Sequence, residues 1–376
     1  MPLRGEKLEK PTYAILRSMR GGSVGDAWLA NHEAYGLVVQ KRYSVIGVED
    51  GAAFHEPQVL IRMKHDNVVR VLEAQWDPEM DKAITFVTVY CEGRCIAKAL
   101  DEDYRFSIGQ SLRLATQMLS ALAYAHTDDS LRLVHRDVKP GNAFLDRDRS
   151  TLFLGDWGSA AEMDEKGTVS GIEGTLLYQA PEGGPPTGRV GIPSDIYGAG
   201  MTLFEMLNGP LPYADLDPEK LDRRVTRGLP ALPPASLVFE PHIQDPLRRI
   251  IRKATRPKPA ERYQLASAFI TAIGQVSGID WRHARGRDLN GVWEGSWPLR
   301  MAPERRRRYR VESAILAAGP GRGRRRLRAY QQVAPGASFA RFGVDDETVD
   351  TDDRSAVERF FAAVEAKAAQ RVPARR

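Results

Sequence analysis

Apolar and polar residues alternate in short runs through residues 12–90, with turn-forming residues between the runs. Alternation with a period of two places one set of side chains on each face of a β-strand. Strands are therefore predicted over the runs rich in Val, Ile and aromatic residues, at 13–19, 26–32, 36–43, 67–76 and 83–90. Residues 52–64 have helical spacing instead. A helix there requires Pro57 to lie in its first turn, because proline has no backbone N–H to donate.

After residue 108 the apolar positions recur with the helical period of about 3.6. The pattern predicts amphipathic helices at 111–126, 245–256 and 263–276. Residues 196–209, IYGAGMTLFEMLNG, are apolar nearly all round and end in glycine, which is typical of a helix buried in the middle of a lobe. The predicted fold class is therefore α+β, with a small β-rich N-lobe followed by a larger helical C-lobe.

The composition is that of a globular protein, since 42% of the 376 residues are hydrophobic and 27% are charged. No run approaches the ~18 apolar residues that a membrane helix needs. The first ten residues, MPLRGEKLEK, are charged and lack the apolar segment of a secretory signal, so a cytoplasmic location is expected. Cys91 and Cys95 have no second Cys or His pair nearby, so they are expected to be reduced and not to bind zinc.

The positive charge is concentrated in the last quarter of the chain. From residue 280 onward there are 21 Lys and Arg against 13 Asp and Glu, a net +8, whereas the rest carries a net −3. This asymmetry predicts a boundary near 276–288. Two arginine-rich strands within 304–334 and a closing helix at 353–371 are predicted beyond it. The predicted division is an N-terminal arm, the N-lobe, the C-lobe and a basic C-terminal extension or small α/β domain, at residues 1–11, 12–91, 92–278 and 279–376.

The residues that suggest a reaction follow the first long helix. Residues 135–142 are HRDVKPGN, and DWG follows at 156–158 after an apolar run. The Asp137 carboxylate could accept the proton of a hydroxyl, and Lys139 could neutralise a phosphoryl group that moves toward that hydroxyl. Asn142 and Asp156 offer the hard oxygen donors that Mg²⁺ prefers. The alternative is that both motifs are polar turns, which this many matching residues make improbable.

HRDVKPGN, DWG and GTLLYQAPE resemble the catalytic loop, the metal-binding DFG motif and the end of the activation segment of eukaryotic-like (Hanks-type) serine/threonine protein kinases. The similarity extends from about residue 13 to about residue 276. It implies a two-lobed protein kinase fold that uses ATP and Mg²⁺ and phosphorylates Ser and Thr of proteins. The Gly, Pro and Arg content further resembles bacterial proteins.

The resemblance assigns the nucleotide-binding roles. Lys41 of LVVQK would bind the α- and β-phosphates, and Glu56 would be its partner on the following helix. Gly22 and Gly25 would belong to the glycine-rich turn over the phosphates. Val89 and Cys91 would offer a carbonyl and an amide to the adenine. Three residues depart from the family pattern and put nucleotide affinity and the active arrangement in doubt, namely Arg20, Ala27 and Trp157.

Further roles in the C-lobe follow from the same motifs. Thr175 is expected to bond Asp137 and Lys139, and Asp195 to hold the backbone of the catalytic loop. Glu182 and Arg262 are expected to form an ion pair. Arg136, before the catalytic aspartate, is typical of kinases controlled by a phosphate in the activation loop. Autophosphorylation is therefore expected, and the candidate sites are Thr168 and Ser170.

Two other functions remain open at this point. A pseudokinase scaffold would explain the departures from the glycine-rich turn and the DFG motif. A regulatory protein that binds nucleic acid through the Arg-rich extension would explain the charge. A soluble partner protein, or docking of the extension on the chain itself, is the preferred interpretation of the extension, and neither a membrane helix nor a sensor domain is expected.

Overall fold

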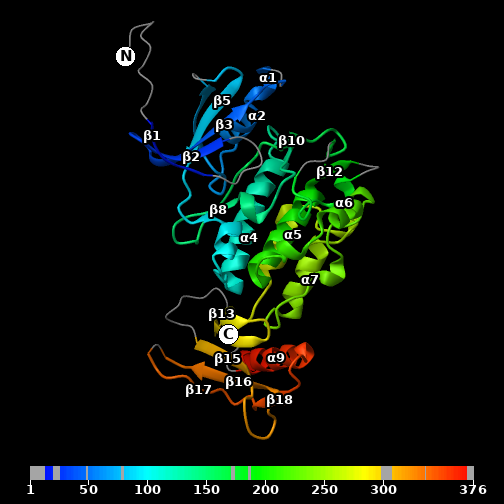
Figure 1. Ribbon diagram of the computed structural model, residues 1–376. Coiled ribbons are helices and arrows are strands. Elements are labelled where there is room, and N and C mark those ends of the chain that lie inside the picture. Colours follow the sequence, from blue (N-terminus) through cyan, green and yellow to red (C-terminus); the bar gives the residue numbers. More distant parts are fainter. Residues whose placement is uncertain are drawn as a thin grey trace, which may run out of the picture.

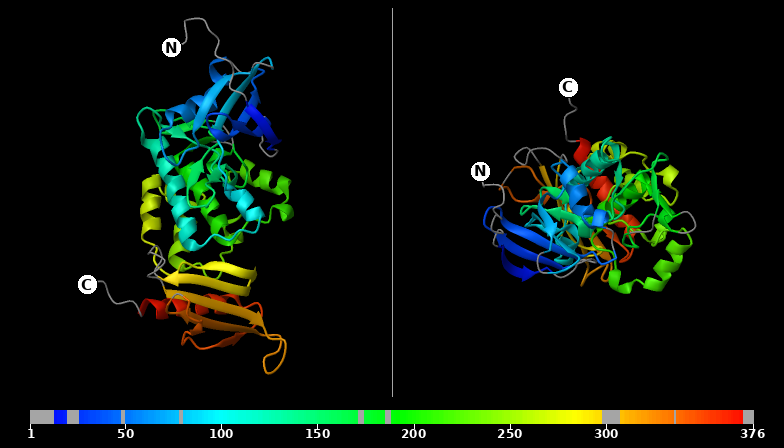
Figure 2. Two further views of the ribbon diagram at one scale, coloured as in Figure 1. Left: turned by 90° about the vertical axis from the view of Figure 1, so that its left-hand side faces the viewer. Right: turned by 90° about the horizontal axis from the view of Figure 1, so that it is seen from above.

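Figures 1 and 2 show the protein as three stacked parts, with a β-sheet at one end, a helical lobe in the middle and a second sheet at the opposite end. This is a computed structural model, and it describes residues 13–19, 26–47, 50–77, 80–170, 174–184, 188–297, 307–334 and 336–370. Among them, no helix is both long and apolar enough to cross a membrane. The two-lobed α+β arrangement that the sequence predicted is confirmed.

The N-terminal sheet is antiparallel, with strand order β1-β2-β3-β5-β4. Its strands are β1 (Tyr13–Ser18), β2 (Asp26–His32), β3 (Gly36–Ser44), β4 (Val71–Trp76) and β5 (Ala83–Val89). Strand β4 begins later than the alternation predicted, at Val71. In the central strand β3, Lys41 pairs with Ala27 on one side and with Phe86 on the other, so its position is fixed by both neighbouring strands.

The helix predicted at residues 52–64, beside this sheet, is interrupted close to Pro57. The segment forms α1 (Asp50–Ala53) and α2 (His55–Arg62), separated at Phe54. Pro57 lies in the first turn of α2, where a missing N–H costs little. Because Pro57 cannot donate to the carbonyl of Ala53, the two helices do not join. Glu56 consequently lies at the start of α2, facing β3.

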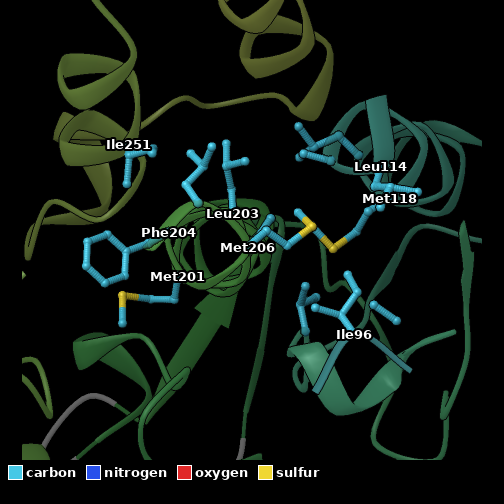
Figure 3. Close-up of a cluster of buried hydrophobic side chains, with 14 of the residues drawn as sticks. Ile96, Leu114, Met118, Met201, Leu203, Phe204, Met206 and Ile251 are labelled. Carbon is cyan, nitrogen blue, oxygen red and sulfur yellow. The ribbon is translucent and has the colours of Figure 1, made fainter. Parts of the chain in front are cut away.

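The helical lobe is built around α5 (Ile192–Asn208), which is buried along almost its whole length. Figure 3 shows side chains of α5 pointing toward α4 (Ile108–Thr127) on one side and α7 (Asp245–Ala254) on the other, with Met206 and Met118 directed at each other. The other helices of this lobe are α3 (Ile96–Asp101), α6 (Pro218–Thr226) and α8 (Ala266–Gly274).

Two glycines allow α5 to approach its neighbours. A Cβ at Gly198 would lie 2.5 Å from the backbone oxygen of Val138, and a Cβ at Gly200 would lie 2.8 Å from the Cβ of Ala254. Any side chain at these positions would therefore push away the 135–142 loop or α7. The YGAG sequence thus fixes how closely the loop lies against the central helix.

Short sheets lie between these helices. One has three strands, β6 (Arg94–Cys95), β8 (Ala143–Leu145) and β9 (Leu152–Leu154). Two others have two strands each, β7 (Leu133–Val134) with β10 (Ala161–Glu162) and β11 (Thr168–Ser170) with β12 (Arg189–Gly191). The 135–142 loop runs between β7 and β8, and the DWG residues follow β9. These pairs set the positions at which both motifs leave the regular structure.

The C-terminal part is a larger sheet than the two predicted strands. It contains β13 (Arg282–Arg287), β14 (Asn290–Trp297), β15 (Arg307–Ile315), β16 (Arg325–Gln332), β17 (Ala340–Arg341) and β18 (Glu347–Val349), and α9 (Arg354–Gln370) covers it. Its buried side chains, including Trp281, Trp293 and Phe361, belong to the same hydrophobic cluster as those of the helical lobe. The extension is therefore packed on the lobe through a shared core.

Candidate functional site

A buried ion pair joins the N-terminal sheet to α2. The Nζ of Lys41 lies 3.0 Å from Oε1 of Glu56. Burial alone would lower the pKa of Lys41, but the groups around it, with the charge of Glu56 the largest among them, together outweigh burial and raise the pKa. Tyr43 and Asp156 act in the same direction. Lys41 is thus a fixed positive charge with carboxylates on two sides.

Asp137 is the centre of a hydrogen-bond network in the loop between β7 and β8. Its Oδ2 accepts from Nζ of Lys139 at 2.7 Å and from Nδ2 of Asn142 at 3.0 Å. Its Oδ1 accepts from the backbone N–H of Thr175 at 3.1 Å and from the Thr175 hydroxyl at 3.3 Å. Lys139 also donates to that hydroxyl at 2.8 Å. The expected contacts of Thr175 with Asp137 and Lys139 are therefore present.

Asp195 holds this loop from the first turn of α5. Its carboxylate accepts the backbone N–H groups of His135 at 2.8 Å and Arg136 at 2.9 Å, and it bonds Nε2 of His126 at 2.8 Å. Burial would raise the pKa of Asp195, but the bond and charge of His126 together with His135 hold it below its usual value. Asp195 therefore remains ionised and fixes the loop backbone, as expected.

The backbone at two motif residues adopts the left-handed conformation, with φ of +69° at Arg136 and +59° at Asp156. Non-glycine residues pay for this conformation in strain, which persists only where the surroundings enforce it. At Arg136 the enforcing contacts are its backbone bond to Asp195 and side-chain bonds to the carbonyls of Ser159 and Ser170. The loop is consequently held in one shape.

Asp156 leaves β9 beside the Lys41–Glu56 pair. A Cβ built on Gly158 would lie 3.6 Å from Oε2 of Glu56 and 3.8 Å from Oδ1 of Asp156, which shows how close the two carboxylates are to this glycine. Asn142 donates from Nδ2 to the backbone oxygen and the Oδ2 of Asp137, so its amide oxygen points away from Asp137. Asn142 and Asp156 therefore provide oxygen donors of the kind that Mg²⁺ binds.

Trp157 fills a closed site in the core. It is fully buried, its indole N–H donates to the carbonyl of Leu154 at 3.2 Å, and its ring lies 4.5 Å from that of His135. The Trp157 side chain therefore fits into the core in the same structure in which the Lys41–Glu56 ion pair is formed.

The segment that ends in APE is anchored to the helical lobe. Arg262 donates from both terminal nitrogens to the two carboxylate oxygens of Glu182, each at 2.7 Å, so the expected ion pair is present. Gly174 has φ of +104°, and a Cβ there would lie 2.7 Å from the carbonyl oxygen of Arg136. Glycine is therefore required before Thr175 for the segment to lie against the loop.

The residues expected to surround the nucleotide base lie at the end of β5. Val89 is its last residue, and its N–H donates to the carbonyl of Arg70 at 3.1 Å. Cys91 is buried two residues further on, and Thr88 before them is buried as well. Gly22, Gly25 and Arg20 lie outside the described residues.

One contributor to the site was not singled out by the sequence. His126 lies in the last turn of α4, among the apolar residues of that helix, and bonds Asp195. A buried histidine in an apolar stripe carries no local signal of its partner, because that partner is 69 residues away.

Comparison with known proteins agrees with the motifs. Residues 13–271 match the family model described as protein kinase domain. The chain is 27% identical over 264 residues to serine/threonine-protein kinase PrkC of Bacillus subtilis, covering 68% of this chain and 39% of that protein. It is 28% identical over 263 residues to serine/threonine-protein kinase par-4 of Caenorhabditis briggsae, covering 68% of this chain and 38% of that protein.

A plant relative gives the same result. The chain is 29% identical over 262 residues to CBL-interacting protein kinase 1 of Oryza sativa subsp. japonica, covering 68% of this chain and 54% of the relative. The chain thus spans between about a third and somewhat over a half of the length of these relatives, and all three matches cover about two thirds of its own length. With the family match over residues 13–271, the two-lobed fold and the network around Asp137, the chain belongs to the protein kinase family.

Proposed function

We propose that this protein is a serine/threonine protein kinase that transfers the γ-phosphoryl group of ATP to Ser and Thr hydroxyls of proteins. The observation that carries the proposal is the single network in which Asp137 is bonded by Lys139, Asn142 and Thr175 while Lys41 is paired with Glu56. Phosphoryl transfer depends mainly on positioning and charge stabilisation, and these residue types supply both.

The network assigns a task to each side chain. Asp137 accepts a hydrogen bond from the substrate hydroxyl and takes its proton as the oxygen–phosphorus bond forms. Lys139, already 2.7 Å from Oδ2 of Asp137, places positive charge beside the transferring group. The Thr175 hydroxyl is bonded to both residues and shapes the position at which the substrate hydroxyl enters. Lys41 binds the α- and β-phosphates in the orientation set by Glu56.

Asn142 and Asp156 are the residues that would hold Mg²⁺. Their oxygens fit that ion, because the amide nitrogen of Asn142 is turned toward Asp137 and Asp156 offers a carboxylate near the Lys41–Glu56 pair. When bound, the metal neutralises charge on the phosphates. The carbonyl of Val89 and the N–H of Cys91 are proposed to bind the adenine, with the turn containing Gly22 and Gly25 over the phosphates.

Transfer of the labelled γ-phosphate of ATP to a generic protein substrate tests the proposal. Asp137→Asn keeps the size of the side chain and removes its ability to accept a proton, so the rate should fall by roughly 10³-fold or more. Asp148→Asn is the matched control, since Asp148 is exposed on the loop between β8 and β9. Equal labelling by wild type and Asp137→Asn would show that the assigned mechanism is wrong, whereas no labelling by wild type would favour a pseudokinase.

Autophosphorylation in β11 is part of the proposal. The hydroxyl of Thr168 accepts from Nε of Arg189 at 3.0 Å, and the carbonyl of exposed Ser170 accepts from Arg136 at 3.2 Å. A phosphate on either residue would therefore have an arginine within reach. Mass spectrometry after incubation with ATP and Mg²⁺ distinguishes the two sites, and an unmodified β11 in an active enzyme would contradict autophosphorylation there.

The extension supports docking on its own kinase lobe. Asp280 accepts from the N–H of Gly109 at 2.6 Å, and Glu358 pairs with Arg248 at 3.0 Å. Several of its arginines already face carboxylates, as Arg310 does with Glu294 at 2.7 Å. We therefore propose that the extension begins near residue 279 and serves docking and partner proteins ahead of nucleic acid. The cytoplasmic location remains a prediction.

A further inference from the structure

A cavity of about 520 Å³ lies where the helical lobe meets the C-terminal sheet. Its wall is formed by the end of α3 and the chain leading to α4, the end of α5, residues 240–242, and residues of β13 and the turn after it. None of the residues of the Asp137 network or of the Lys41–Glu56 pair belongs to this wall. The cavity is therefore a separate site. The segments that line it lie where the helical lobe meets the C-terminal sheet, which is at the end of the lobe opposite the N-terminal sheet (Figure 1).

The charges in the wall are not balanced. Asp101 pairs with Lys98 at 3.0 Å, and Asp103 accepts from Arg105 at 2.8 Å. The carboxylates of Glu240 and Asp288, by contrast, pair with no Lys or Arg within 4 Å in the described part of the chain, and Arg248 contacts only the backbone carbonyl of Glu240, at 3.3 Å. The nearest basic atom to the Glu240 carboxylate is Nδ1 of His283, 3.9 Å from its Oε2, which is too far for a hydrogen bond. The wall thus carries four carboxylates and one guanidinium group, that of Arg105.

Three residues of the wall each have a buried polar atom that makes no hydrogen bond within the described residues. These atoms are Oε2 of Glu240, Nδ1 of His242 and Nε2 of His283, and only 3% of His242 is exposed. A buried polar atom without a partner costs about 1–3 kcal/mol, so such atoms in a native structure call for a partner that completes them. All three residues line the same cavity, so a ligand that occupies it would lie beside all three.

The ionisation states of Glu240, His242 and His283 suit the binding of a cation in the cavity. Burial raises the pKa of Glu240 to about 7. The positive charges of Arg354 and Arg105 act to lower this pKa, and the negative charge of Asp288 raises it further. Burial lowers the pKa of His242 to about 3 and lowers that of His283. Both histidines are therefore neutral near pH 7, so they add no repelling charge and a ring nitrogen can accept a hydrogen bond.

We propose that this cavity binds a small organic cation bearing an ammonium or guanidinium group, with Glu240 as its counter-ion and Nδ1 of His242 as a hydrogen-bond acceptor. The volume lies in the range of about 300–1,000 Å³ that small-molecule sites occupy. Among the described residues, no group of three or more His, Cys, Asp and Glu side chains is placed to hold a metal ion, so an organic cation fits better than a metal. The ligand would touch both the lobe and the sheet.

Calorimetric titration of the full-length protein tests the proposal, with putrescine and agmatine as probes and 1,4-butanediol as the neutral counterpart of putrescine. Saturable binding of an amine, without binding of the diol, is expected. Glu240→Gln keeps the shape of the side chain and should weaken binding about tenfold or more. Glu219→Gln, on the exposed face of α6, is the matched control and should bind as wild type does. Absence of saturable binding, or equal affinities for the two variants, would overturn the proposal.

The pH dependence gives a second, independent measurement on wild-type protein. Glu240 faces His283 of β13, Arg105 before α4, Asp288 of the turn and Arg354 of α9. Because its carboxyl must ionise to pair with the cation, the affinity should rise roughly tenfold between pH 6 and pH 8. A flat profile would contradict the role of Glu240 even if Glu240→Gln failed to fold. Asp288→Asn, on an exposed turn, should weaken binding by a smaller factor than Glu240→Gln.

Discussion

Replacing Arg262 with methionine should destabilise the helical lobe strongly. The Arg262 side chain is fully buried, and each of its five N–H groups has an acceptor. Two bonds go to the Glu182 carboxylate and three to backbone carbonyls, those of Pro193, Pro257 and Arg256. Methionine has similar length and no donor, so it removes all five bonds without opening a large cavity.

The magnitude follows from the groups left behind. Each of the three carbonyls that loses a buried donor costs about 1 kcal/mol. The carboxylate of Glu182, of which only 14% is exposed, keeps the Ser194 hydroxyl at 2.7 Å but loses its counter-ion. Breaking a buried ion pair from one side typically costs about 3–5 kcal/mol, a range that already includes the bonds lost by neighbouring groups, and we expect the free energy of unfolding to fall by that amount.

Urea unfolding followed by circular dichroism measures this loss. A double variant, Arg262→Met with Glu182→Gln, also removes the buried charge of Glu182 and should recover about 1–3 kcal/mol relative to additive behaviour. Arg223→Met on α6, where the side chain is 59% exposed, is the matched control and should change stability by less than about 0.5 kcal/mol. A loss below about 1 kcal/mol for Arg262→Met, or full additivity in the double variant, would refute the argument.

Three further predictions concern the site. Glu56→Gln removes the counter-ion that contributes to the raised pKa of Lys41, and it should lower kcat/KM for ATP about tenfold or more in the labelled-phosphate assay. The control Glu219→Gln, at an exposed position, should leave kcat/KM unchanged. The pKa of Asp195 is lowered in the folded protein, so the ionised carboxylate contributes to stability above the unfolded pKa of about 3.9, and this contribution is lost as the pH falls through the folded pKa. Asp195→Asn should therefore lower stability at pH 7 and make the midpoint of urea unfolding less sensitive to acid. An unchanged dependence of that midpoint on acid pH would contradict the role of Asp195. Asp280→Ala removes the acceptor of the Gly109 N–H at the start of α4 and should lower stability by about 0.5–2 kcal/mol, with no loss in thermal unfolding arguing against the capping role.

The hydrogen-bond network around Asp137 could be predicted because its signals are local. Asp137, Lys139 and Asn142 occupy one short loop, and Asp156 follows an apolar strand, so spacing alone groups them. Lys41 and Glu56 required the family resemblance, because an ion pair between a strand and a helix leaves no periodic signal. His126 could not be found in this way, since its role depends on a contact with Asp195 across the lobe.

The extension was predicted least well, for a physical reason. Strand β13 consists of RHARGR, and its polar residues hide the alternation that identifies strands. Short helices were missed likewise, since α6 buries only Val225 of its nine residues and has little apolar periodicity. The cavity beside Glu240 joins segments more than 40 residues apart along the chain, namely 240–242 with His283, so only the packed fold places them together.

The extension and the catalytic loop lie at opposite ends of the same helix. Asp280 contacts the first turn of α4 through Gly109, where a Cβ would lie 2.8 Å from the carboxylate. Seventeen residues later the last turn of α4 supplies His126 to Asp195, which holds the loop backbone. A helix of this length spans about 30 Å and behaves as a rigid element when it is packed on all sides. Because Trp281, Trp293 and Phe361 share one core with the lobe, removing the extension would expose apolar surface at the end of that helix. The extension is therefore a structural part of the kinase lobe, and its inner face is hydrophobic. Its arginines whose side chains the structure describes are exposed or half-buried, apart from Arg325, which is buried and donates to the carbonyl of Thr351.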